Sequence, residues 1–120
     1  MKVACATSGI DLDAPLDSRF GRALKFLVYD TETKTFALMD NEQNLQAAQG
    51  AGIQSAQTVA SSGAEALIAC HCGPKAYRVL AAANIKVYTT NAATVKEALD
   101  LYQEGKLVES SAADVEGHWA

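Results

Sequence analysis

The chain has 120 residues, a length typical of one domain, and an ordinary globular composition with 49% hydrophobic and 20% charged residues. Its net charge of -4 argues against broad binding to nucleic acid or to an anionic membrane, because both need a basic face. No apolar run approaches the roughly 20 residues that span a bilayer, and the N-terminus lacks a signal-peptide pattern. We therefore expect a cytoplasmic protein that binds neither membrane nor nucleic acid.

Apolar periodicity and turn residues predict eight elements in the order β-β-β-α-β-α-β-α. The first strand, KVACAT, lacks strict alternation and is typical of a central strand covered on both faces. The polar residues 31–34 predict a hairpin, Asn84 predicts the end of a helix, and Thr94 with Glu97 predicts a capping box that opens the last helix. The predicted strands are 2–7, 26–30, 35–40, 66–70 and 86–89, and the predicted helices are 53–62, 74–82 and a last one that ends at Gly105.

The order of the elements predicts how the sheet is connected. Three strands in succession form an antiparallel meander, and the two later β-α-β units are right-handed crossovers between parallel strands. If the fourth and fifth strands run parallel to the first, the loops 8–25, 41–52 and 71–73 all emerge at one edge. Open α/β sheets bind ligands outside the carboxyl ends of their strands, so we expect a binding site at this edge.

The first candidate cluster lies in the loop after the first strand. Arg19 and Arg22 flank Gly21, and Ser18 precedes them. Arginine offers forked donors that suit oxyanions, and glycine lets the backbone approach a ligand closely. An equally good interpretation is a solvated loop with an ion pair between Asp17 and Arg19.

The second candidate is the turn that contains Gly50 and Gly52, directly before a predicted helix. Such turns expose amide groups that attract negative charge. A dinucleotide site is not indicated, because these glycines do not directly follow a strand. The simpler interpretation is a tight entry into the helix.

The third candidate cluster follows the fourth strand and reads Cys70-His71-Cys72-Gly73-Pro74-Lys75. Thiols and imidazole suit copper, zinc or an iron–sulfur cluster, and at strand spacing Cys70 and Cys72 would point the same way. We expect Cys70, like Cys5, to lie in the core, and His71 and Cys72 to reach the loop edge as possible metal ligands. Gly73 and Lys75 would add helix amides and a positive charge, although spacing alone favours simple solvent exposure for Lys75.

An enzyme and a metal module are the competing classes. A nuclease of this architecture would need carboxylates on the central strand to hold Mg²⁺, and KVACAT has none. A copper or zinc module that uses the cysteines and His71 directly remains an alternative, as does an interaction domain without a ligand. Three cysteines in a reducing compartment indicate thiols or metal ligands instead of a disulfide framework.

Several segments together resemble the dinitrogenase iron–molybdenum cofactor biosynthesis family. The resemblance covers residues 1–107, which we expect to form one cofactor-binding domain, followed by a loose polar tail over 108–120. The matching residues are Asp11, Asp13, the run 17–23, residues 50–54 with Ala56, Gly73-Pro74 with Ala76, and residues 85–88.

The resemblance implies a ribonuclease-H-like three-layer α/β fold with a five-stranded mixed sheet and helices on both faces. It also implies a non-catalytic protein that carries a molybdenum-containing sulfide cluster or its thiomolybdate precursor, held largely without covalent bonds. A protein that assembles or receives the cluster is the implied partner. Cys70-His71-Cys72 departs from the small or polar residues common in relatives, which indicates a particular metal preference. The resemblance implies a mixed molybdenum–copper sulfide cluster.

Overall fold

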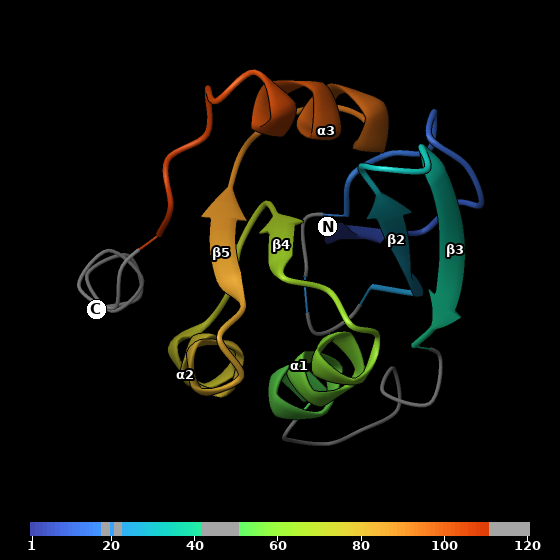
Figure 1. Cartoon of the computed structure of the whole chain (residues 1–120). Helices are drawn as coiled ribbons and strands as arrows, with labels where there is room; N and C mark the ends of the chain where they lie inside the picture. Colours follow the sequence, from blue (N-terminus) through green and yellow to red (C-terminus); the bar gives the residue numbers. More distant parts are fainter. Residues whose placement is uncertain (18–19, 21–22, 42–50, 111–120) are drawn as a thin grey trace.

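The computed structural model describes residues 1–17, 20, 23–41 and 51–110, and its eight elements follow the predicted order (Figure 1). The strands form one five-stranded mixed sheet in the order β3-β2-β1-β4-β5. The strands are β1 (Lys2–Thr7), β2 (Lys25–Asp30), β3 (Thr35–Asp40), β4 (Ala66–Ala69) and β5 (Lys86–Thr89), and the helices are α1 (Ala51–Ser61), α2 (Pro74–Ala82) and α3 (Val95–Gln103).

The pairing of the strands confirms the predicted connections. β2 is antiparallel to both β1 and β3, whereas β4 pairs parallel with β1 and with β5. β1, β3, β4 and β5 therefore run in one direction, and their carboxyl ends share one edge of the sheet, which we call the carboxyl edge. β1 occupies the centre, and its residues from Val3 to Thr7 are buried.

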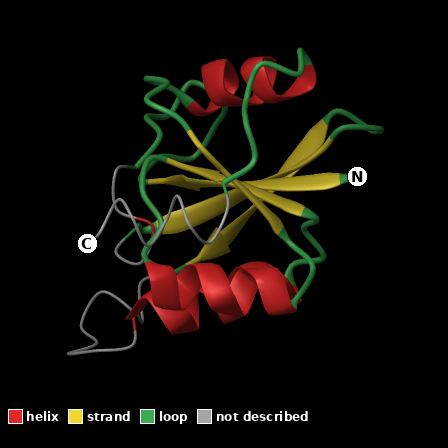
Figure 2. Ribbon diagram, turned by 90° about the vertical axis from the view of Figure 1, so that its left-hand side faces the viewer, coloured by secondary structure: helices red, strands yellow, loops and turns green. Residues whose placement is uncertain are grey.

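Helices cover both faces of the sheet, which gives the expected ribonuclease-H-like arrangement of three layers (Figure 2). On one face, Ala56 and Val59 of α1 and Leu80 of α2 pack with Leu67 and other sheet residues in one apolar cluster. On the other face, α3 contributes Leu99 and its neighbours to a second cluster. Alternate residues of β1 and β4 point to opposite faces, so each strand supplies both clusters.

Local sequence signals explain the element boundaries. Asn84 adopts φ 62° just after α2, and Gly63 adopts φ +83° after α1, as expected for residues that end helices. The hydroxyl of Thr94 accepts the N–H of Glu97 at 3.1 Å, which confirms the cap that opens α3. Lys34 closes the predicted hairpin with its N–H bonded to the carbonyl of Asp30 at 2.8 Å.

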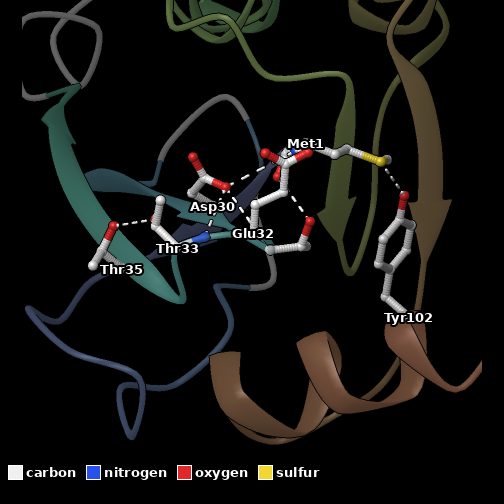
Figure 3. Close-up of polar contacts among 7 residues, drawn as sticks. Met1, Asp30, Glu32, Thr33, Thr35 and Tyr102 are labelled. Carbon is white, nitrogen blue, oxygen red and sulfur yellow. Dashed lines mark hydrogen bonds and ion pairs between the residues drawn. The ribbon is translucent and has the colours of Figure 1, made fainter.

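Polar contacts tie the N-terminus to the edge opposite the carboxyl edge (Figure 3). The ammonium group of Met1 lies 3.9 Å from the carboxylate of Asp30 and 3.7 Å from that of Glu32. The hydroxyl of Tyr102 donates to the sulfur of Met1 at 3.6 Å. These contacts fasten β1 to the hairpin and to α3, and they leave the carboxyl edge uninvolved.

The predicted tail begins with residues that are bonded to the sheet. Glu109 forms a bridge with Tyr88, and the N–H of Ser110 donates to the carbonyl of Val87 at 2.7 Å. The expectation of a loose tail is therefore wrong for these two residues, whereas residues 111–120 lie outside the described part of the chain. No helix in the described residues is both long enough and apolar enough to cross a bilayer.

Candidate functional site

The loop after β1 is anchored at two points, one before its arginine-containing stretch and one within it. Before the stretch, the N–H of Asp17 donates to the carbonyl of Ala6 at 2.8 Å, and the hydroxyl of Thr7 donates to the carbonyl of Pro15 at 2.8 Å. These bonds hold the loop against the carboxyl end of β1. Ser18, Arg19, Gly21 and Arg22 themselves lie outside the described residues.

Phe20 provides the second anchor of this loop. Its side chain is buried in the cluster beneath α1 and α2, and its ring lies 5.3 Å from that of Phe26. Burial of this large apolar side chain is favourable and stabilises the loop in this position. The loop is therefore attached to the core between the two arginines that the sequence singled out.

Asn41 joins three segments at the end of β3. It is fully buried, and its amide nitrogen donates to the carbonyl of Ala23 at 2.8 Å and to the hydroxyl of Ser55 at 3.1 Å. Ser55 belongs to α1, so this contact holds the first turns of the helix near the carboxyl edge. Gly52 is the second residue of α1, and Gly50 lies outside the described residues.

The first turn of α2 also begins at the carboxyl edge and lacks a side-chain cap. Gly73 is the N-cap and offers no side-chain acceptor, Pro74 follows it, and the turn contains no acidic residue. No described residue outside the helix accepts the N–H groups of Lys75 and Ala76. A Cβ built on Gly73 would meet no atom of the described residues within 4 Å apart from its chain neighbours, so these residues leave the space before this turn open.

The two cysteines after β4 lie on opposite faces of the sheet, and the prediction that they point the same way is wrong. β4 ends at Ala69, one residue earlier than predicted, so strand alternation does not extend to Cys72. Cys70 is half-buried beside the α3 cluster, whereas Cys72 is buried in the cluster of α1 and α2. Cys5 is buried in the core as expected.

The thiols at this edge favour their protonated forms. Burial raises the pKa of Cys72 to about 12. Burial, and secondarily the negative charge of Asp17, also raise the pKa of Cys70. Reactive or metal-binding thiols usually have lowered pKa values in electropositive surroundings. These two cysteines therefore do not form a ready thiolate pair.

His71 lies between the two cysteines with an exposed side chain. Within the described part of the chain, no three histidine, cysteine or carboxylate side chains group together as a metal site would require. A closed site with several protein ligands is thus not present among these residues.

Sequence reasoning missed the role of Asn41 and Ser55. Asn41 was interpreted only as the start of a polar loop, and Ser55 as one residue of a helix. A buried amide that bonds to a buried hydroxyl 14 positions away leaves no local pattern in a sequence. The contact forms only because α1 folds back over the sheet.

The chain matches the dinitrogenase iron-molybdenum cofactor family over residues 1–105. The chain belongs to this family. Its relatives include an uncharacterized protein of Methanocaldococcus jannaschii, which is 35% identical over 95 residues, with 77% of this chain and 80% of the relative covered.

Two solved structures support the same family assignment. The apo form of the orange protein from Desulfovibrio gigas is 37% identical and superimposes with a TM-score of 0.89 over 92% of both chains. A putative NifB protein from Thermotoga is 39% identical and superimposes with a TM-score of 0.78 over 90% of this chain and 91% of that one. The expected family and fold are thereby confirmed, and these similarities support a cofactor-related binding protein.

Proposed function

We propose that this chain is a non-catalytic, cytoplasmic carrier of a molybdenum-containing metal–sulfur cluster, or of its thiomolybdate precursor. The observation that carries the proposal is the first turn of α2 at the carboxyl edge, which has neither a side-chain cap nor an acidic residue and which no described residue covers at Gly73. Family membership and the similarity to the apo orange protein support a ligand of this kind.

The proposed binding chemistry is that of an anion with soft sulfide edges. The free N–H groups of a helix N-terminus and the helix dipole attract negative charge, and α1 and α2 both begin at the carboxyl edge. Arginine forks would add charge-assisted hydrogen bonds. The proposed binding residues are Ser18, Arg19, Gly21, Arg22, Gly50, Gly52, Gly73 and Lys75.

Copper is the proposed second metal of the cluster. Bridging sulfides would supply most of the soft ligands that copper prefers. Because Cys72 is buried with a raised pKa, its thiol would bind copper only after losing a tightly held proton. We propose that His71 and Cys72 at most assist in assembling the cluster, and that sulfide and charge hold it.

Uptake of tetrathiomolybdate with copper tests the proposal. The purified apo protein should retain a visible chromophore through gel filtration, and the Arg19→Ala/Arg22→Ala variant should bind at least about tenfold more weakly, because hydrogen bonds to charged groups are worth about 1.5–3 kcal/mol each. The matched control is Lys2→Ala/Lys86→Ala, which removes the same charge from exposed residues at the opposite edge. A colourless wild-type protein, or equal loss in both variants, would count against the proposal.

Metal analysis distinguishes the proposed carrier from the alternative, a copper or zinc module. Under the carrier proposal, the holo protein from its native host contains molybdenum, and His71→Ala and Cys72→Ala change its molybdenum content little. Copper or zinc without molybdenum, lost in both variants, would instead support direct binding by these side chains. The described residues offer that module no group of three ligands.

A further inference from the structure

A buried side chain joins segments that carry proposed binding residues. Asn41 directly follows β3 and is 0% exposed, and its amide nitrogen donates to the carbonyl of Ala23 at 2.8 Å and to the hydroxyl of Ser55 at 3.1 Å. Ala23 comes directly after Arg22, and Ser55 lies in the first turns of α1, shortly after Gly52. One amide therefore links the end of the arginine-containing stretch to the start of a helix.

The link needs an amide and a hydroxyl, and not merely side chains that fill space. The amide nitrogen of Asn41 donates to two partners, and its oxygen also accepts from the hydroxyl of Ser55 at 3.3 Å. Ala23 and Ala56, the residue after Ser55, belong to the apolar cluster of α1 and α2, so the link lies beside apolar side chains. Apolar side chains would serve packing alone, whereas a fully bonded polar group fixes one arrangement of its partners.

The arginine-containing stretch is held on both sides of Arg22. On one side, Phe20 is 3% exposed and its ring lies 5.3 Å from that of Phe26. On the other side, the carbonyl of Ala23 is bound by Asn41, and the N–H of Ala23 donates back to the carbonyl of Phe20 at 3.4 Å. Both ends of the short segment that contains Arg22 are therefore fixed to the core.

We propose that Asn41 is a positioning residue of the anion site, which holds the chain next to Arg22 against the first turns of α1. The guanidinium of Arg22 and the N-terminal amides of α1 then act on the same ligand. Asn41 is itself fully buried, so it acts through the segments that it holds. Donors that are already held in place bind more tightly, because the ligand does not have to order them. This inference rests on the proposed carrier function and deepens it.

A purely structural link and a positioning link have different consequences. A structural link, when broken, lowers the free energy of unfolding and leaves the affinity of the folded protein unchanged. A positioning link, when broken, also lowers the affinity of the folded protein and alters the surroundings of the bound anion. The visible circular dichroism of the bound chromophore reports those surroundings, since an achiral anion shows it only in an asymmetric site.

Ser55→Ala and Asn41→Leu break the link from its two sides. Each should weaken the binding of tetrathiomolybdate with copper about three- to tenfold, the usual effect of losing one hydrogen bond, and should reduce the circular dichroism per bound chromophore. The matched control is Val59→Ala, because Val59 is 1% exposed, lies one turn later in α1 and takes no part in the link. This control should destabilise the fold, yet bind within about twofold of the wild type.

Urea unfolding checks that each protein is folded under the conditions of the titration. If Asn41→Leu does not fold, Ser55→Ala suffices as the test, because it removes a single hydroxyl group. A folded Ser55→Ala protein with the affinity and dichroism of the wild type, or an equal loss of binding in Val59→Ala, would overturn the positioning role and leave the carrier proposal standing. A wild type that binds no thiomolybdate would overturn both.

Discussion

The helices α2 and α3 begin at the same edge of the sheet, on opposite faces, and their first turns differ in hydrogen bonding. In α3, Thr94 and Glu97 form the cap, and the loop after β1 supplies the remaining acceptors: the N–H groups of Val95 and Lys96 donate to the carbonyls of Ala14 at 2.9 Å and Leu12 at 2.8 Å. In α2, the described residues provide no equivalent acceptors.

Among the described residues, this contrast separates a helix start that the fold itself satisfies from the one that we propose binds the cluster. The unsatisfied N–H groups of a helix N-terminus need a partner, which is a side chain, backbone, water or ligand. The loop after β1 uses its backbone to complete α3 and reaches the core again at Phe20 on the face of α2. The same loop thus stabilises the start of α3 and places Phe20 in the apolar cluster that includes Ala76 of α2.

The largest expected effect is the loss of folding stability at high pH that comes from the buried thiol on each face of the sheet. Burial raises the pKa of Cys5, on the α3 face, and of Cys72, on the α2 face, from about 9 to about 12. The folded protein therefore keeps protons that the unfolded chain releases. The stabilisation is fully present below about pH 9 and is lost as pH rises towards 12, by about 1.4 kcal/mol per thiol and pH unit.

Urea unfolding at about pH 8 and about pH 10.5 measures this loss. Between these pH values the free energy of unfolding of the wild type should fall by roughly 2–4 kcal/mol through the two thiols. In Cys5→Ala and Cys72→Ala it should fall by about half as much. Because each variant is compared with itself at the lower pH, any destabilisation by the substitution cancels. If a variant lost as much stability between the two pH values as the wild type does, the thiol that it lacks would ionise normally in the folded wild-type protein.

The next effect comes from giving α2 the cap that α3 already has. Gly73→Asp adds a carboxylate where a side chain meets open space and the backbone has the extended conformation of a cap. We expect thiomolybdate affinity to fall at least about tenfold, while the free energy of unfolding stays equal or rises by about 1 kcal/mol. Ligand titration and urea unfolding provide the two measurements.

Thr94→Asp is the matched control, because it adds the same charge at the N-cap of α3 and keeps a capping side chain. Its thiomolybdate affinity should remain within about twofold of wild type. Equal weakening by both substitutions would mean that net charge, and not the start of α2, governs binding.

The smallest expected effect comes from replacing a lysine at the second position of α2 or of α3. Lys75 of α2 and Lys96 of α3 are both exposed. Replacing either by glutamate should stabilise the fold by about 0.3–1 kcal/mol through the helix dipole. Only Lys75→Glu should weaken thiomolybdate binding, by a few fold. The same titration of both variants checks this, and similar weakening in Lys96→Glu would contradict it.

Local signals predicted most of the fold. The Thr94 cap, Asn84 in the left-handed region and the hairpin closed by Lys34 each depend on a few neighbouring residues, so the sequence carries them directly. The parallel direction of the later strands followed from the helices that connect them, since β-α-β units join parallel strands.

The candidate site was predicted less completely. Cys70 and Cys72 separate because pairing with β1 and β5 ends β4 at Ala69, which is a tertiary effect. The bond between Asn41 and Ser55 likewise needs two distant elements in contact. Arg19 and Arg22 remain a prediction, since they lie outside the described residues.

The Asn41–Ser55 bond has an evolutionary consequence. It fastens together the ends of the segment 42–50, so the fold depends on the two ends and little on the number of residues between them. Doubling the length of such a closed loop adds only about 0.6 kcal/mol of entropic cost. Insertions and deletions should therefore accumulate here among homologues, which would let related proteins reshape the carboxyl edge without disturbing the core.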